Sequence, residues 1–292
     1  MNKTDIIVTS LAEYIEKVTN VAGTVFYSGT TNLFPIYRGQ ANSEWDLNPA
    51  TYRNNRFKHE KNFICEMERI APDAFAGMSR IDKLIKMQHY GLPTRLLDFS
   101  RNSLIALYFA CYKVPEKNGS VYEIHAMPML HQDAVLVSVV MKYLFEYGNE
   151  FFNPDRFIRE LSEKDYPGKF FADFKNREGV KQVLSAIYGI YPKYTNERVR
   201  NQDGVFVLAG MEIRETEMGC FAFFPKMQSD IKSIWPESRC IIIPKESKQG
   251  ILQALDKIGI NERKLFPGLE ADAHSAVQRV EDQQILTHGN TY

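Results

Sequence analysis

The stretch that organises this chain is residues 88–100, Gln88-His89-Tyr90-Gly91-Leu92-Pro93-Thr94-Arg95-Leu96-Leu97-Asp98-Phe99-Ser100. Polar and charged side chains crowd here between two apolar segments, a mixture that is rare in loops that only connect elements. Pro93 favours an extended conformation at Leu92, so the preceding helix is expected to end near His89. We therefore predict that this stretch holds its polar groups on a stiff corner and forms part of a functional site.

The composition is that of a globular protein without a global charge preference. The 292 residues are 44% hydrophobic and 12% aromatic, which is enough for a sizeable core. Lys plus Arg and Asp plus Glu each total 36, so a nucleic-acid or membrane partner would need a local patch. No stretch approaches the roughly 18 to 20 apolar residues that cross a bilayer, and no apolar leader opens the chain. We expect a cytoplasmic protein with reduced thiols and no membrane partner.

Hydrophobic periodicity predicts an α+β fold. Strands are expected at residues 33–37, 96–99, 121–125, 188–191, 205–208, 221–224 and 240–244, and helices at residues 11–18, 57–75, 81–88, 103–112, 248–258 and 271–281. Residues 133–187 show mostly helical patterns, which we interpret as a helical insertion within one domain of residues 1–292. Because strands and helices do not alternate regularly, a mixed sheet is favoured over a doubly wound one.

Arg38 is the first candidate binding residue. It follows the apolar and aromatic run that ends at Tyr37, and Gly39 after it lets a backbone or a ligand approach closely. A guanidinium at this point could bind phosphate or carboxylate through two parallel charge-assisted hydrogen bonds. The alternative is a structural ion pair with Asp98 or Glu44.

The second candidate cluster lies in the stretch quoted above. Arg95 is expected to contact an anion, and the helix that begins after Ser100 offers free backbone N–H groups to the same ligand. The alternative is that Thr94, Asp98 and Ser100 only satisfy turn and cap hydrogen bonds. His89 could act as a general base, although a histidine at a helix end is more often structural.

The third cluster is a polar run at residues 196–204 that stops at a β-branched and aromatic strand. Within it we single out Arg198 and Gln202. Gln202 carries a donor and an acceptor, which suits recognition of a ribose or an amide rather than proton transfer. Any carboxylate chemistry here would need Asp203 or Glu197. The alternative for the remaining residues is a solvated loop with capping side chains.

Several common catalytic motifs are absent from the sequence. It has no phosphate-binding P-loop, no dinucleotide-binding glycine motif, no zinc-protease motif and no nucleophile elbow. The cysteines show no zinc-ligand spacing. Hydride transfer, P-loop ATP hydrolysis and zinc-dependent hydrolysis are therefore disfavoured, and we expect no metal.

These clusters together resemble the FRG domain family, which is named for a Phe/Tyr-Arg-Gly motif. The family motifs occur here in four blocks: Tyr37-Arg38-Gly39-Gln40 with Trp45, Leu47, Pro49 and Arg53; residues 88–98 leading into Ala106-Leu107-Tyr108-Phe109-Ala110; Arg198, Gln202, Gly204 and Phe206; and Leu265-Phe266-Pro267-Gly268-Leu269-Glu270. The resemblance spans residues 33–276. It implies a bacterial protein of a family that is sometimes associated with phage defence.

A more distant likeness is to ADP-ribosyltransferases, which also open with an aromatic-Arg-Gly strand end. This likeness implies a related fold, NAD as the cofactor, and activity as an ADP-ribosyltransferase or NAD glycohydrolase in a toxin or defence effector. On it, Arg38 would hold an NAD phosphate or ribose, Thr94 and Ser100 would shape the nicotinamide pocket, and Gln202 would occupy the catalytic-glutamate position. The predicted binding set is completed by six further residues: Tyr37, Gly39, His89, Arg95, Asp98 and Arg198. A protein or a nucleic acid would be the acceptor.

The glutamine at the glutamate position limits this interpretation. Gln202 cannot carry the negative charge that stabilises an oxocarbenium-like ribose, so Asp203, Glu197 or Asp98 must approach the same point. The predicted catalytic set is therefore Arg38, Gln202 and Asp203. Two alternatives are a non-catalytic sensor of a nucleotide or nucleic acid, and a protein-interaction module that contacts a partner through residues 133–187.

Overall fold

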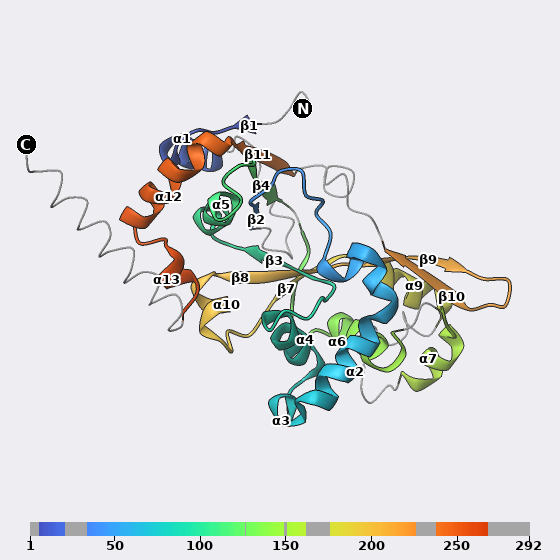
Figure 1. Cartoon of the computed structure of the whole chain (residues 1–292). Helices are drawn as coiled ribbons and strands as arrows, with labels where there is room; N and C mark the ends of the chain where they lie inside the picture. Colours follow the sequence, from blue (N-terminus) through green and yellow to red (C-terminus); the bar gives the residue numbers. More distant parts are fainter. Residues whose placement is uncertain are drawn as a thin grey trace, which may run out of the picture.

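A mixed β-sheet runs through the centre of the computed structural model, which describes residues 6–20, 34–125, 127–148, 151–161, 176–225 and 238–267 (Figure 1). The described strands of this sheet follow the order β1 (Ile6–Ile7), β11 (Arg239–Ile243), β4 (Gly119–Ile124), β2 (Ile36–Gln40), β3 (Leu96–Ser100), β8 (Gly204–Leu208), β7 (Tyr188–Tyr191) and β5 (Met129–His131). The pairs β1–β11 and β5–β7 are parallel, and the other neighbours are antiparallel. The predicted mixed sheet with many helices is thus confirmed.

The helices pack against the sheet in two groups. The first contains α1 (Leu11–Thr19), α5 (Ser103–Cys111) and α12 (Lys248–Lys257), which share an apolar cluster with β2, β4 and β11. The second contains α2 (Glu60–Ile70), α3 (Pro72–Phe75), α4 (Arg80–His89), α6 (Val135–Lys142), α7 (Pro154–Glu160) and α9 (Arg177–Ser185), whose apolar cluster includes residues of β3, β7 and β8. None of the described helices is long and apolar enough to cross a membrane.

Both helical groups cover the same face of the sheet. Tyr37 of β2 is in register with Ser100 of β3, and Asp98 of β3 with Phe206 of β8. Side chains in register point to the same face of a sheet, and residues two apart along a strand share that face. Tyr37 packs in the first cluster and Phe206 in the second. The polar residues Asp98 and Ser100 therefore lie on this face between the two helical groups.

A second, smaller sheet and a set of short elements complete the described structure. β6 (Phe151–Phe152) and β9 (Met211–Glu215) flank β10 (Phe221–Pro225) in antiparallel pairing. Residues 133–187 contain α6, a π-helical turn at Tyr143–Tyr147, β6, α7 and α9. The other short elements are 3₁₀ helices at Ala50–His59 and Lys245–Ser247, α10 (Glu197–Asn201) and α13 (Glu262–Leu265). The predicted helix at residues 271–281, residue 33, and residues 149–150 and 162–175 of the predicted insertion lie outside the described residues.

Two predicted elements differ from the structure. The strand expected at residues 33–37 begins only at Ile36 and continues through Arg38 to Gln40, because its ladder with β4 runs from the Ile36–Ile124 pair to the Gln40–Ser120 pair. The helix expected over residues 57–75 is divided: a 3₁₀ helix ends at His59, α2 ends at Ile70, and α3 begins at Pro72. Proline has no backbone N–H to continue a helix and is favoured in a first turn, which accounts for the second break.

The close approach of α5 to β2 depends on glycine. A Cβ atom built on Gly39 would lie 1.8 Å from the backbone oxygen of Ala106 and 2.7 Å from the backbone nitrogen of Ala110. Gly119 of β4 meets the same helix, since its Cβ would lie 2.1 Å from the Ala110 oxygen. Gly39 was predicted to allow the close approach of a backbone or a ligand, and the structure shows that the backbone of α5 makes this approach.

We expect Gly39→Ala to lower the free energy of unfolding by about 1 to 3 kcal/mol or more, because the new methyl group meets backbone atoms that cannot rotate away. Urea denaturation measures this loss. Gly250→Ala on α12 is the matched control, since a Cβ there meets nothing within 4 Å. That substitution should stabilise the protein by about 0.5 to 1 kcal/mol through helix propensity. Equal stability of the two variants would contradict the packing role of Gly39.

Candidate functional site

The ladder between β2 and β3 opens after a single register pair, Tyr37 with Ser100, and Arg38 bridges the opening. Its Nη1 donates a hydrogen bond to the backbone oxygen of Asp98 at 2.5 Å. The Nε atom is buried and has no hydrogen-bond partner among the described residues. Glu44 pairs instead with Lys117 at 3.0 Å, so the alternative ion pair between Arg38 and Glu44 is not formed.

Charge and burial act in opposite directions on this guanidinium. Burial lowers the pKa of Arg38, the Asp98 carboxylate opposes that shift, and the charge of nearby Arg53 adds to it. A buried donor without a partner costs about 1 to 3 kcal/mol, and an anionic ligand that accepts from it would remove that cost. Arg38 therefore has unused capacity to bind an anion.

Asp98 presents an exposed carboxylate from the middle of β3, while Leu97 and Phe99 on either side are buried. Its Oδ1 accepts a hydrogen bond from Gln88 Nε2 at 2.8 Å. The Thr94 hydroxyl in turn donates to Gln88 Oε1. Two successive hydrogen bonds, from Thr94 to Gln88 and from Gln88 to Asp98, thus orient the Asp98 carboxylate without neutralising its charge.

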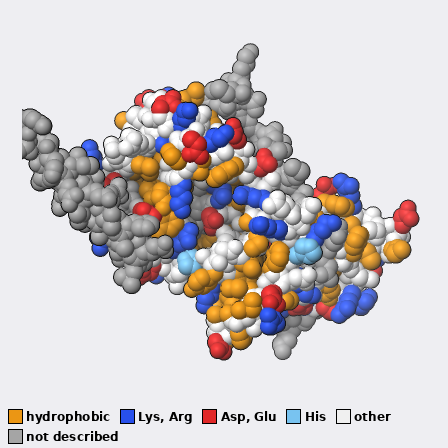
Figure 2. All heavy atoms as spheres, in the orientation of Figure 1, with side chains coloured by type: hydrophobic (Ala, Val, Ile, Leu, Met, Phe, Trp, Pro, Cys, Tyr) orange, Lys and Arg blue, Asp and Glu red, His pale blue; other side chains and the backbone are white. Residues whose placement is uncertain are grey.

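Two adjoining cavities border this carboxylate. The larger, of about 180 Å³, is lined by residues of β2, β3 and α5, and the smaller, of about 80 Å³, by residues of α4, β3 and β8. Four residues line both: Asp98, Phe99, Arg198 and Gln202. Figure 2 shows Lys and Arg side chains gathered around a hollow in the middle of this face of the molecule. We call the two adjoining cavities together the central cavity.

Arg198 enters the central cavity from α10, a short helix capped by the side chain of Asn196. Its guanidinium carbon lies 5.0 Å from the centre of the Phe266 ring, which packs edge-on against Phe109 of α5. Among the described residues Arg198 makes no side-chain hydrogen bond or ion pair. A guanidinium that lies over an aromatic ring can still donate hydrogen bonds in its own plane, so Arg198 is a second group suited to an anion.

His89 lies at the C-terminal end of α4 and lines the smaller part of the central cavity. Partial burial of the ring and then the charge of Arg198 lower the pKa of His89 below its ordinary value of 6.5. The imidazole is therefore mostly neutral at pH 7 and able to accept a proton.

Gln202 and Ser100 line the central cavity, but their hydrogen bonds also hold the chain together. Gln202 Nε2 donates to the backbone oxygen of Leu265 at 2.9 Å, next to the donation from Asn201 Nδ2 to the Lys264 oxygen at 2.8 Å. The Ser100 hydroxyl donates to the Gln202 backbone oxygen at 2.7 Å. These bonds join β3, α10 and α13, three segments that are far apart in the sequence.

The structure brings most of the predicted site residues together, namely Tyr37, Arg38, Gly39, His89, Asp98, Ser100, Arg198 and Gln202. Three others do not line the central cavity. Arg95 is buried in an ion pair with Glu60 at 2.6 Å, and Thr94 is buried behind Gln88. Asp203 accepts a hydrogen bond from the Tyr194 hydroxyl at 2.8 Å.

The N-terminal end of α5 was predicted to offer its backbone N–H groups to the ligand, but this end does not line the central cavity. Asn102 caps this helix by accepting from the Leu104 N–H, and α5 meets the cavity through Ala106 and Phe109. Gln88, Phe109 and Phe266 were not among the predicted binding or catalytic residues. Gln88 and Thr94 lie on either side of the Gly-Leu-Pro turn, and this spacing favours a side-chain hydrogen bond across the turn. Nothing in the local sequence pattern indicates that Phe266 packs against Phe109.

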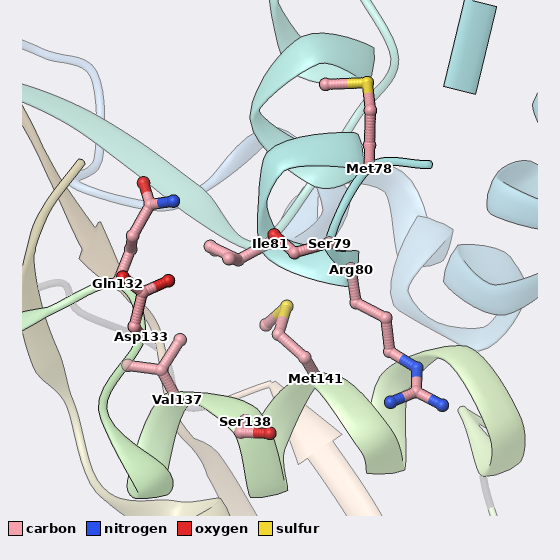
Figure 3. A pocket seen from close by; sticks show the side chains of 9 residues that line it. All are labelled: Met78, Ser79, Arg80, Ile81, Gln132, Asp133, Val137, Ser138 and Met141. Carbon is pink, nitrogen blue, oxygen red and sulfur yellow. The ribbon is translucent and has the colours of Figure 1, made fainter. Parts of the chain in front are cut away.

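A larger cavity of about 440 Å³ lies between α4 and α6 (Figure 3). Its charged side chains are already paired, Arg80 with Glu146 and Asp133 with Lys193. Within the part of the chain that the structure describes, no group of His, Cys, Asp or Glu side chains could hold a metal ion. The central cavity, where two arginines face an exposed carboxylate, is thus the stronger candidate site.

Comparison with known protein families gives a match over part of the chain. Residues 35–119 match the FRG domain family, which supports the resemblance drawn from the sequence motifs over this segment. The match contains Arg38, Gln88 and Asp98, whereas Arg198 and Gln202 come from the chain beyond it. No curated protein and no solved structure matches the chain.

Proposed function

We propose that the FRG domain of this protein, completed by α10, binds a phosphorylated nucleotide in the central cavity and acts on NAD as an ADP-ribosyltransferase or NAD glycohydrolase. One observation carries the proposal. Two arginines that form no ion pair with a described carboxylate, Arg38 and Arg198, line the same cavity as the exposed carboxylate of Asp98, whose charge acts on Arg38. Guanidinium groups suit phosphate oxygens, and a single carboxylate suits a developing positive charge.

The binding roles follow from the positions of the side chains. Arg38 and Arg198 would donate to phosphate oxygens, and the buried Nε of Arg38 would gain an acceptor that no described residue provides. Phe109 and Tyr37 give the larger part of the central cavity an aromatic wall for a planar ring or a ribose. At about 180 Å³ this part is smaller than the roughly 300 to 1,000 Å³ of pockets for drug-sized ligands, so it would enclose only part of a dinucleotide.

The chemical step requires a negative charge beside the ribose. The bond between the anomeric carbon and the nicotinamide nitrogen breaks, its electron pair leaves with nicotinamide, and the ribose becomes oxocarbenium-like. Asp98 would stabilise this positive charge, because its carboxylate is exposed to the cavity and held by Gln88. Water or an acceptor then bonds to the anomeric carbon, and neutral His89, which lines the smaller part of the cavity, would take the proton released.

Asp98 takes the carboxylate role here in place of Asp203 and Gln202, which were predicted as catalytic residues from the sequence. Asp203 is turned toward Tyr194, and the amide nitrogen of Gln202 is committed to Leu265. Gln202 would orient the substrate through its remaining carbonyl oxygen. We further propose, on the FRG resemblance, that consumption of NAD makes the protein a toxin or a phage-defence effector.

We expect Arg38→Ala and Arg198→Ala each to weaken NAD binding about 10- to 100-fold, since each removes charge-assisted hydrogen bonds worth about 1.5 to 3 kcal/mol. Titration calorimetry measures the affinity, and chromatography measures the release of nicotinamide. Arg69→Ala is the control, because Arg69 is exposed and pairs only with its helical neighbour Glu66. Unchanged affinity in folded Arg38→Ala protein would contradict the assignment. NAD binding without release would support the alternative of a non-catalytic nucleotide sensor.

A further inference from the structure

A row of cations lies along residues 53–61, which we call the basic strip. Its sequence, Arg53-Asn54-Asn55-Arg56-Phe57-Lys58-His59-Glu60-Lys61, contains four cations and one acid. Glu60 does not balance this charge, because it is buried and its carboxylate is bonded to Arg95. Lys61 Nζ donates to the backbone oxygen of Glu146, so we consider Arg53 and Arg56 as the cations that the strip presents. Arg53 and Arg56 are exposed and form no ion pair with any described carboxylate.

The basic strip is held firmly on the protein. The buried hydroxyl of Tyr52 donates to the backbone oxygens of Ala209 and Gly210, at 3.2 and 2.8 Å. Phe57 is buried in the larger apolar cluster. Both ends of residues 53–56 are therefore anchored, and their exposed side chains are presented from a fixed backbone.

The basic strip begins beside the central cavity. Arg53 is fixed by two hydrogen bonds from its guanidinium to the Asn48 backbone oxygen, at 3.3 Å from Nε and 3.0 Å from Nη2. In this position it is close enough to Arg38 for the two charges to interact. Figure 2 shows that the Lys and Arg side chains around the central hollow continue over the segment that leads into α2.

The whole chain has no net charge, because Lys plus Arg and Asp plus Glu each total 36. The positive charge of the basic strip is therefore a local excess. One phosphate needs one or two cations, whereas a row of cations on a fixed surface matches the repeated phosphates of a polynucleotide. We propose that the basic strip binds the sugar-phosphate backbone of a nucleic acid and delivers it to the central cavity as the acceptor of ADP-ribose.

This inference rests on the proposed function for its chemical step but not for its binding step. In the transfer, a base nitrogen or a hydroxyl oxygen of the nucleic acid forms a bond to the anomeric carbon of NAD. The bond to nicotinamide breaks and its electron pair leaves with nicotinamide, while the acceptor's proton passes to His89 and then to water. Binding of the strand needs only the basic strip and can be measured without NAD.

Fluorescence polarisation with labelled 20-nucleotide single-stranded DNA, single-stranded RNA and duplex DNA tests the binding step between 25 and 200 mM NaCl. Wild-type protein is expected to bind at least one of them with salt-dependent affinity. Arg53→Ala/Arg56→Ala should bind at least about 10-fold more weakly, and its salt slope on single strands should fall by about 1.4, or about 0.7 for each lost contact. Arg159→Ala/Lys257→Ala removes the same charge from exposed positions elsewhere and should bind like wild type.

Each outcome bears on a distinct claim. No binding to any of the three at 25 mM NaCl, or equal binding by the strip and control variants, would overturn the basic strip as a nucleic-acid surface. Radiolabelled NAD then tests the acceptor: label on the oligonucleotide supports the inference, and label only on protein overturns it. NAD should raise the melting temperature of the Arg56→Ala variant as it does that of wild-type protein, because Arg56 does not line the central cavity. If wild-type protein binds nucleic acid through the strip but neither binds nor cleaves NAD, the proposed function fails while the nucleic-acid surface stands.

Discussion

Replacement of Glu60 with Gln is expected to lower the free energy of unfolding by about 3 to 5 kcal/mol, because it leaves the buried guanidinium of Arg95 without a counter-charge. Glu60 and Arg95 are only 1% and 2% exposed. The carboxylate accepts from Arg95 Nη2 at 2.6 Å, from its Nε at 3.0 Å and from its backbone N–H at 3.1 Å. This pair links the start of α2 to the start of β3 and so fixes the strand that carries Asp98.

Urea denaturation with a common m-value measures this loss. Glu66→Gln is the matched control, since it breaks an exposed Glu–Arg pair on the same helix and should leave stability nearly unchanged. The double variant Glu60→Met/Arg95→Met should be much more stable than Glu60→Gln, because it removes both buried charges together. A loss below about 1 kcal/mol in Glu60→Gln would show that Arg95 finds another partner or water.

Asp98→Asn is expected to reduce the rate of nicotinamide release from NAD on the order of 100- to 1,000-fold, the size of effect seen when one preorganised electrostatic group is removed. NAD affinity should change little, because the amide oxygen of the substituted side chain could still accept the hydrogen bond from Gln88 that orients Asp98. Single-turnover release with saturating NAD separates the chemical step from binding. The substitution therefore tests the role of the negative charge itself.

Asp203→Asn identifies which carboxylate acts. Asp203 is bonded to the Tyr194 hydroxyl and does not line the central cavity, so its substitution should cost far less activity than Asp98→Asn. The reverse order of effects would contradict the role proposed for Asp98 and restore the carboxylate that the sequence analysis placed in the catalytic set. Folding of each variant is checked by its melting temperature without NAD.

Much of the secondary structure could be predicted because its signals are local. α4 ends at His89 as expected, where Gly91 adopts a left-handed φ of +91° before Pro93. α5 begins after Asn102, whose side chain accepts from the Leu104 N–H. The strands β3, β4, β8 and β11 lie within one or two residues of their predicted positions. Caps, turns and apolar runs act over a few residues, so one sequence suffices to find them.

Short elements and edge strands were missed for a physical reason. β5 has three residues and β6 two, too few to show a period. β9 reads Met-Glu-Ile-Arg-Glu, and its alternation of buried and exposed residues is itself a local strand signal that was overlooked. α10 was expected as a polar loop because its five residues, Glu-Arg-Val-Arg-Asn, bury none of their side chains. The conformation of such short segments depends on tertiary contacts, which the local sequence does not predict.

The sequence by itself determined the chemical types at the site: an arginine and a glycine in the segment that forms β2, a polar corner around Asp98, and a polar run before β8. The tertiary structure decided which members of each cluster meet. It placed Arg95 in a buried pair with Glu60 and Arg198 in the central cavity, and it turned Asp203 away while exposing Asp98. The reason is that burial and orientation follow from strand register, Tyr37 with Ser100 and Asp98 with Phe206, between segments far apart in the chain.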